Sequence, residues 1–88
     1  MTFVYMLISL KNKKFISYVG WTNDLLKRLE LHNQGKGAKF TRGRKWKLIY
    51  FEILSNKNKA IKREYKIKKD RKLRNFIKQN YLKYKNNA

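Results

Sequence analysis

The chain has 88 residues, enough for one domain with a modest hydrophobic core and too few for two. It carries 24 Lys and Arg against five Asp and Glu, and the formal net charge of +19 indicates a polyanionic partner, with nucleic acid favoured over an anionic membrane surface. It has no cysteine and one histidine, which excludes a disulfide framework, a thiolate metal site, a cysteine nucleophile and a multi-histidine metal site.

The first 19 residues predict a β-hairpin. Residues 3–10 are apolar on both alternating faces, which predicts a strand buried on both sides, and 15–19 predict a second strand after a polar turn at 11–14. If Leu10 pairs with Phe15, then Leu7 faces Tyr18, and Tyr5 and Tyr18 share one face of the sheet; a three-residue loop would separate them. The apolar run is too short to span a bilayer, and lysines follow it instead of preceding it, so we expect a cytoplasmic protein with no membrane partner.

A strand end and a helix start meet in the stretch 18–33. The strand is predicted to break at Gly20, and a helix is predicted over about 23–33, capped by Thr22 or Asn23. Arg28 and His32 are four residues apart and therefore lie side by side on this helix. Together with Tyr18, they form a cluster capable of acid–base chemistry that also holds a phosphate-binding cation.

The segment 34–45 has three glycines and no periodicity, which predicts an exposed loop. Its basic residues lie close to Phe40 and Trp46, and such mixing favours phosphate contacts with stacking on bases or sugars. The alternative is a solvated charged loop whose aromatic residues fasten it to the core. The candidate nucleic-acid contacts are Lys36, Lys39, Arg42, Arg44 and Lys45.

The second half of the chain predicts one strand and two helices. The strand covers 46–54, with Ile49, Phe51 and Ile53 on one face and Leu48, Tyr50 and Glu52 on the other. The first helix covers 57–69 and has Glu64 within an apolar stripe, where a carboxylate needs a cation or a metal ion as partner. The second helix follows a cap at Asp70, and a frayed basic tail is expected over 83–88, so that the domain covers 1–82.

In this order, the residues resemble the GIY-YIG nuclease domain, and most of all its small stand-alone bacterial members. The first motif corresponds to Phe3-Val4-Tyr5 and the second to Tyr18-Val19-Gly20; Arg28, His32 and Glu64 follow in the family's order. The resemblance covers nearly the whole chain, and the loop 35–44 is also similar. It implies an α+β fold with a three-stranded antiparallel sheet and about three helices.

The resemblance also implies cleavage of phosphodiester bonds with one divalent metal, Mg²⁺ or Mn²⁺. Tyr5 and Tyr18 match the two motif tyrosines, near the attacking water and the scissile phosphate. Arg28 matches the arginine that neutralises the phosphate, and Glu64 matches the sole protein ligand of the metal. His32 occupies a position where the family has tyrosine or histidine.

Three positions depart from the family pattern or match it loosely. Phe3 replaces the first glycine of the first motif. Trp21 stands where the family's repair nucleases have a lysine, and Asn75 corresponds to a late polar residue of the family. The missing lysine concerns substrate class and rate more than it concerns the fold.

Chemistry alone favours His32, assisted by Tyr18, as the base that activates water, because imidazole titrates near neutral pH. The sequence therefore predicts a metal-dependent DNA endonuclease with limited base readout, nucleoid-associated, acting in repair or recombination as a monomer or weak dimer. RNA is the alternative substrate. The rival hypotheses are a nucleic-acid-binding protein of the same fold without efficient cleavage and a basic accessory protein bound to ribosomal RNA or to an acidic partner.

Overall fold

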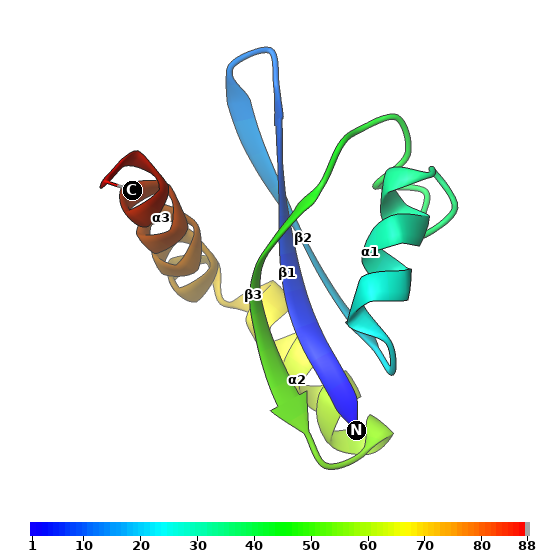
Figure 1. Cartoon of the computed structure of the whole chain (residues 1–88). Coiled ribbons are helices and arrows are strands. Elements are labelled where there is room, and N and C mark those ends of the chain that lie inside the picture. The colour runs from blue at the N-terminus through cyan, green and yellow to red at the C-terminus, as the bar shows by residue number, and fades with distance from the viewer. Residues whose placement is uncertain (88) are drawn as a thin grey trace.

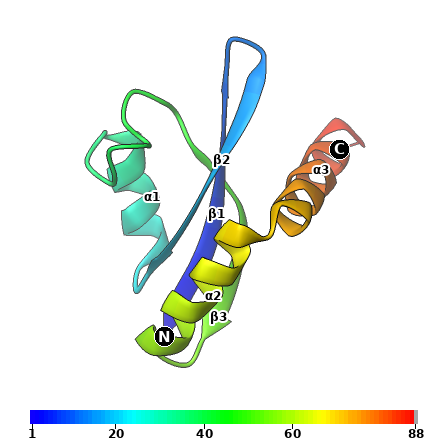
Figure 2. The same ribbon diagram turned by 180° about the vertical axis from the view of Figure 1, so that it is seen from behind.

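The computed structural model describes residues 1–87, which form a three-stranded antiparallel sheet and three helices (Figure 1). The sheet order is β2-β1-β3, so the first strand lies in the centre. Helix α1 lies on one face of the sheet and α2 on the other, as the view from behind also shows (Figure 2). The predicted α+β fold is confirmed. The elements are β1 (Thr2–Lys11), β2 (Lys14–Thr22), α1 (Leu25–Asn33), β3 (Lys47–Leu54), α2 (Lys57–Lys69) and α3 (Arg71–Asn87).

The central strand β1 is buried on both sides, as its continuous apolar sequence predicts. Tyr5 and Leu7 face α1 and pack with Trp46. Val4 and Met6 face the other way and belong to a second cluster, which α2 and α3 complete. The domain therefore has two small cores, one on each face of the sheet. The buried residues of the second are Val4, Met6, Val19, Ala60, Ile67 and Ile77.

The hairpin has the register that places both tyrosines on one face. Leu10 pairs with Phe15 and Leu7 with Tyr18, as predicted. Asn12 and Lys13 form a two-residue turn with φ values of 55° and 64°, the left-handed conformation that matches the twist of a tight hairpin. Tyr5 consequently lies opposite Gly20 and diagonal to Tyr18.

The start of α1 differs from the prediction. β2 does not break at Gly20 but continues to Thr22, which pairs with Phe3. The helix begins at Leu25 and its N-cap is Asp24, not Thr22 or Asn23. Asp24 Oδ1 accepts a hydrogen bond from the backbone N–H of Lys27 at 3.1 Å, and its negative charge suits the positive end of the helix dipole. Thr22 supports this turn instead, because its hydroxyl accepts from the Asp24 N–H at 3.1 Å.

A β-bulge in β3 corrects the predicted division of its two faces. Met6 pairs with Tyr50, but the next residue, Leu7, pairs with Leu48, so one residue of β3 is unpaired. Leu48 therefore packs with Tyr5 and Leu7, while Tyr50 packs in the opposite core. An alternating pattern cannot reveal this shift, because an inserted residue changes the face without changing the composition.

Side-chain caps mark the starts of α2 and α3. Asn56 Oδ1 accepts from the N–H of Lys59 at 2.9 Å, and Asp70 Oδ1 accepts from that of Leu73 at 3.0 Å, so the predicted cap at Asp70 is confirmed. Residues 83–87 continue α3 where the sequence predicts a frayed tail; Ala88 lies outside the described residues. Over the described part of the chain, no helix combines the length and the apolar character needed to cross a bilayer.

Candidate active site

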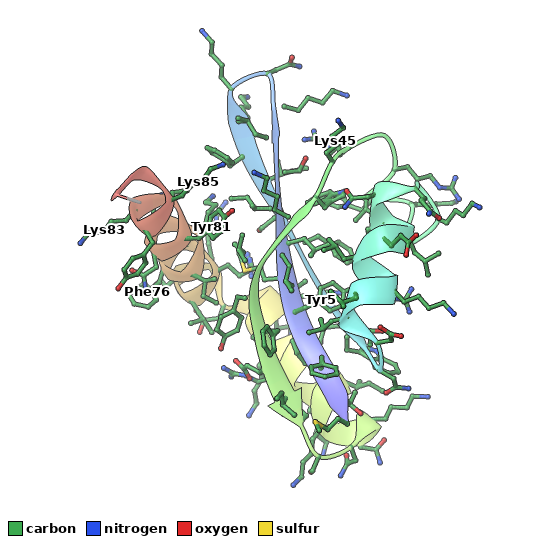
Figure 3. The ribbon with its side chains drawn as sticks, viewed as in Figure 1. Tyr5, Lys45, Phe76, Tyr81, Lys83 and Lys85 are labelled. Atoms are coloured by element: carbon green, nitrogen blue, oxygen red, sulfur yellow. The ribbon has the colours of Figure 1, made fainter. Side chains whose placement is uncertain are left out.

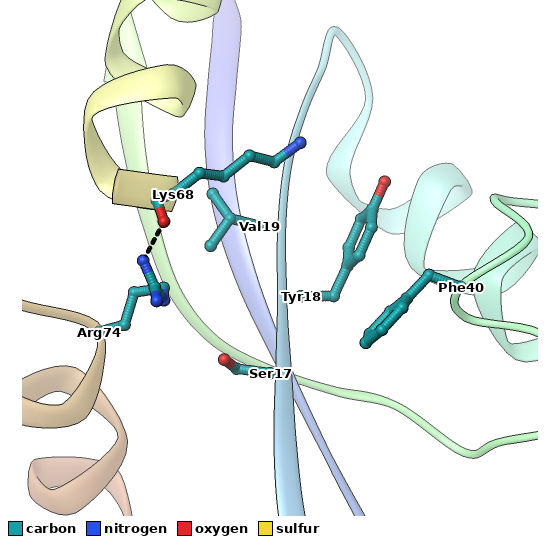
Figure 4. Close-up of a pocket in the computed structure, with 6 residues that line it drawn as sticks. All are labelled: Ser17, Tyr18, Val19, Phe40, Lys68 and Arg74. Atoms are coloured by element: carbon teal, nitrogen blue, oxygen red, sulfur yellow. Dashed lines mark hydrogen bonds between the residues drawn. The ribbon is translucent and has the colours of Figure 1, made fainter. Parts of the chain in front are cut away.

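The candidate site lies at the free edge of β2. An edge strand leaves one side open, so loops and helices from both faces of the sheet can reach around it. An open pocket of about 260 Å³ lies there (Figure 4). Its lining residues come from β2, from the loop after α1 and from α2 and α3: Ser17, Tyr18, Val19, Phe40, Lys68 and Arg74.

Behind Tyr18, a chain of hydrogen bonds joins Tyr5 to the loop. Tyr5 Oη lies 2.7 Å from His32 Nε2, and His32 Nδ1 lies 2.8 Å from Thr41 Oγ1. The Thr41 hydroxyl donates its one proton to the carbonyl of Ala38 at 3.0 Å, so it must accept from His32. This assigns the proton of the neutral imidazole to Nδ1 and leaves Nε2 to accept from the Tyr5 hydroxyl.

Electrostatics keep this chain neutral. Burial, reinforced by neighbouring Tyr18, raises the pKa of Tyr5 far above its usual value, although the positive charge of Arg28 acts in the opposite direction. Burial and Arg28 both lower the pKa of His32. A protonated tyrosine that donates to an unprotonated nitrogen agrees with both shifts. His32 is only 1 % exposed, so the imidazole is buried.

Two glycines are required by the tight packing of this chain. A Cβ atom at Gly20 would lie 2.5 Å from Tyr5 Oη, because the Tyr5 ring crosses over the neighbouring strand at that point. A Cβ atom at Gly37 would lie 2.3 Å from His32 Nδ1. The glycine of the second motif therefore provides space for a tyrosine of the first motif, a reason that is visible only in the paired strands.

Aromatic contacts fix Tyr18 at the mouth of the pocket. Its ring centroid lies 6.4 Å from that of Tyr5 and 5.0 Å from that of His32, the latter in an edge-to-face arrangement. On its other side it stacks on Phe40 at 6.1 Å and 22°. Figure 4 shows the two rings side by side, with the amine of Lys68 directed across β2.

Arg28 and Glu64 complete the group that the sequence predicts. The charge of Arg28 lowers the pKa of Tyr5 and the charge of Glu64 raises it, while Arg28 itself lines a separate open pocket at the start of α1 with Thr22 and Asp24. Tyr5, Tyr18 and His32 touch one another, whereas Arg28 and Glu64 approach from α1 and α2. Two motif tyrosines and a histidine that are distant in the sequence thus lie in direct contact.

Glu64 is the candidate metal ligand, and in this structure its carboxylate pairs with the ammonium group of Lys68. Lys68 Nζ lies 3.0 Å from Glu64 Oε1 and 5.9 Å from the centre of the Tyr18 ring. Within the described residues, no three His, Cys, Asp or Glu side chains gather into a metal cage. A single carboxylate still fits Mg²⁺ or Mn²⁺, since these ions keep several waters and bind phosphate oxygens.

The basic residues of the loop 34–45 do not all lie at the candidate site. Lys36, Lys39 and Arg42 are exposed, while Arg44 is half-buried. Lys45 lines a different pocket, beside the hairpin. Phe40 stacks on Tyr18, but Trp46 is buried and its indole N–H donates to the Thr41 carbonyl at 2.8 Å. One aromatic residue therefore belongs to the candidate site and the other fastens the loop to the core.

Sequence reasoning missed Lys68, Arg74 and Thr41. Lys68 follows Glu64 by four residues, so helical spacing predicts that the two meet; for Arg74 and Thr41 no local signal exists. Trp21 lies on the opposite face of β2 from Tyr18, against the core under α2, with Lys57 Nζ 5.5 Å from its ring centre. The ammonium group beside Tyr18 comes from α2 instead.

Comparisons with known proteins show the family of the chain. Residues 1–85 match the model of the GIY-YIG catalytic domain. A UPF0213 protein of Clostridium perfringens is 54% identical over 70 residues, which are 78% of this chain and 72% of the relative. The UPF0213 protein YazA of Bacillus subtilis is 44% identical over 72 residues, 81% of this chain and 70% of that protein.

A solved structure is similar along the full length. The solution NMR structure of a UPF0213 protein from Bacillus halodurans is 30% identical, with a TM-score of 0.50, over 100% of this chain and 95% of that one. The fold, the ordered motif residues and the match over nearly the whole chain lead to one conclusion: the protein belongs to the GIY-YIG catalytic domain family.

Proposed function

We propose that the protein is a metal-dependent endonuclease that hydrolyses DNA phosphodiester bonds with limited base readout. The observation that carries this proposal is the direct contact of the two motif tyrosines with one another and with His32, beside the ion pair of Glu64 with Lys68 at the Tyr18 ring. The net charge of +19 supports a nucleic-acid substrate. RNA remains the alternative substrate, and repair or recombination the expected process.

We assign the following roles to the site residues. Tyr18, half-buried at the pocket, contacts the scissile phosphate or the attacking water, and Arg28 neutralises the non-bridging oxygens. Glu64 would hold Mg²⁺ or Mn²⁺, which supplies further neutralisation of the phosphate and stabilises the leaving oxygen. Lys68 and Arg74 add positive charge to the same pocket.

The proposed route of the proton differs from the one that chemistry alone favoured. Tyr5 and Thr41 engage both nitrogens of His32, so neither nitrogen is free to take a proton from water. It acts through Tyr5 instead: the Tyr5 oxygen takes a proton from water while its own proton passes to His32 Nε2. Because burial raises the pKa of Tyr5, we propose that the two transfers are concerted and do not pass through a free tyrosinate.

A second candidate function has one specific observation in its favour. The ion pair between Lys68 and Glu64 can be a purely structural contact, as in a binding protein of the same fold that does not cleave. The first test is nicking of supercoiled plasmid with Mg²⁺ or Mn²⁺, against EDTA and against Glu64→Ala. Metal-dependent nicking that the variant loses supports the nuclease, whereas tight binding without cleavage of plasmid or branched DNA supports the binding protein.

A further inference from the structure

A second pocket, of about 220 Å³, lies between the β1–β2 hairpin and the last turns of α3. It shares no lining residue with the pocket at Tyr18. Its walls are apolar and aromatic: Leu10 and Phe15 come from the hairpin and Tyr81 from α3. Leu10 is 58% and Phe15 39% exposed, so this hairpin presents apolar surface to the solvent in a strongly basic protein.

Three lysines stand around these apolar walls. Lys45 and Lys47 come from the end of the basic loop and the start of β3, and Lys85 comes from α3. The bulge in β3 pairs Lys47 with Ile8, which also lines this pocket. The neighbouring ammonium group of Lys47 lowers the pKa of Lys85, so two positive charges lie close together. Such a pair favours an anion between them.

Figure 3 shows that Tyr81 and Lys85, which line the pocket, lie on one side of α3. Tyr81 and Lys85 point toward the hairpin, whereas Phe76 and Lys83 lie on the outer side of the helix. The helix thus divides its basic residues between a pocket and open solvent. This division provides a matched control, because Lys83 carries the same charge on the same helix outside the pocket.

We propose that this pocket binds one unpaired nucleotide of a nucleic-acid strand, with the base against Phe15 and Tyr81 and a phosphate on Lys47 and Lys85. Aromatic walls suit any base because every base has a π-face, and lysines suit the phosphate. The volume is below the roughly 300–1,000 Å³ of pockets for drug-sized ligands, so it fits one base and not a larger cofactor.

The basic loop connects this pocket to the candidate active site. Phe40 lines one pocket and Lys45 the other, and five residues of chain span at most about 18 Å between their Cα atoms. That length corresponds to about five nucleotide steps at about 3.4 Å per step along a strand. A strand held at Lys47 and Lys85 can therefore reach Tyr18. The inference rests on the proposed nuclease function only in taking the bound strand to continue to Tyr18.

The test compares two labelled DNA duplexes that differ by a single extrahelical nucleotide, bound to the full chain in EDTA and followed by fluorescence anisotropy. The wild-type protein is expected to bind the duplex with the unpaired nucleotide about tenfold more tightly. Phe15→Ala should abolish this preference, and Lys47→Gln should reduce it. Lys83→Gln is the matched control and should leave the preference unchanged.

Equal binding of the two duplexes by wild type and Phe15→Ala would overturn the pocket and leave the proposed nuclease intact, while binding of neither would count against both. A second measurement locates the ligand. Amide NMR shifts on addition of deoxyadenosine monophosphate are expected near residues 8–15, 45–47 and 81–85. Shifts there with decyl phosphate but not with the nucleotide would overturn the proposal in favour of an acidic lipid.

Discussion

The ammonium group of Lys68 lies 3.0 Å from the carboxylate of Glu64 and 5.9 Å from the centre of the Tyr18 ring. One flexible side chain thus contacts the proposed metal ligand and a motif tyrosine at once. A metal ion at Glu64 would compete with this ammonium group. Lys68 would then be released toward the pocket, where a phosphate group would meet it.

The first prediction concerns this competition. Lys68→Ala removes the competing cation, so the affinity for Mn²⁺ should rise about two- to fivefold, since an exposed i,i+4 ion pair contributes little. Plasmid nicking should fall, because the phosphate loses a positive charge. Mn²⁺ binding is measured by electron paramagnetic resonance. Lys62→Ala, an exposed position on the same helix, should change neither quantity. Unchanged Mn²⁺ affinity in Lys68→Ala would show that Lys68 does not compete with a metal ion at Glu64.

The second prediction concerns pH. The pKa of His32 is lowered in the fold, so the unfolded chain binds more protons below about pH 6.5. The contribution of His32 to the free energy of unfolding is therefore fully present above that pH and is lost as the pH falls toward the folded-state pKa. Urea denaturation at several pH values should show a decline in wild type that is flatter in His32→Gln. Equal slopes in the two proteins would contradict the buried neutral imidazole.

His32 and Glu52 affect the stability of the protein in different pH ranges. Arg63 donates hydrogen bonds to Glu52 at 2.7 and 2.9 Å, and this contact lowers the pKa of the carboxyl. Its stabilisation is present above the unfolded value of about 4.5 and is lost only below it. Measurements between pH 5 and pH 8 therefore report on the histidine.

A third prediction tests the close approach at Gly20. Gly20→Ala should displace the Tyr5 ring, because the new Cβ atom would lie 2.5 Å from its hydroxyl oxygen. We expect a loss of about 1–3 kcal/mol in the free energy of unfolding. Nicking should fall further than the loss of folded protein explains, because the bond between Tyr5 and His32 is broken. Gly35→Asn is the control, since nothing lies near that position and asparagine tolerates its positive φ. A variant as stable and active as wild type would refute this role for Gly20.

The fourth prediction concerns the exposed part of the basic loop. Lys39→Ala and Arg42→Ala should each weaken DNA binding about equally for unrelated sequences and should reduce the salt dependence by about one ion. Binding titrations at several salt concentrations measure both effects. Lys83→Ala, on the outer side of α3, is the control with the same loss of charge. A loss confined to some sequences would mean that the loop reads bases.

Much of the site could be predicted because its residues lie in locally readable elements. The register of the hairpin follows from a short polar turn between two apolar runs, and it places Tyr5 and Tyr18 on one face. Helical spacing places Arg28 beside His32 and predicts an inward carboxylate at Glu64. These placements depend on neighbours within a few residues, so the sequence contains the information.

The role of His32 could not be predicted in the same way. The sequence marks it as a base near neutral pH, but Thr41 and Tyr5 occupy its two nitrogens, and both come from other parts of the chain. Which imidazole nitrogen carries the proton depends on the hydrogen bond that the other ring nitrogen makes. Only the folded structure brings those partners together.

By itself, then, the sequence determined the elements, the order of the motif residues and the excess of positive charge, because propensity, periodicity and composition act locally or over the whole chain. The tertiary structure decided the Asp24 cap, the bulge that turns Lys47 toward the second pocket, and the placement of Lys68 and Arg74 at Tyr18. Each of these is a choice between competing local arrangements of similar energy. Packing of distant segments against one another decides such choices.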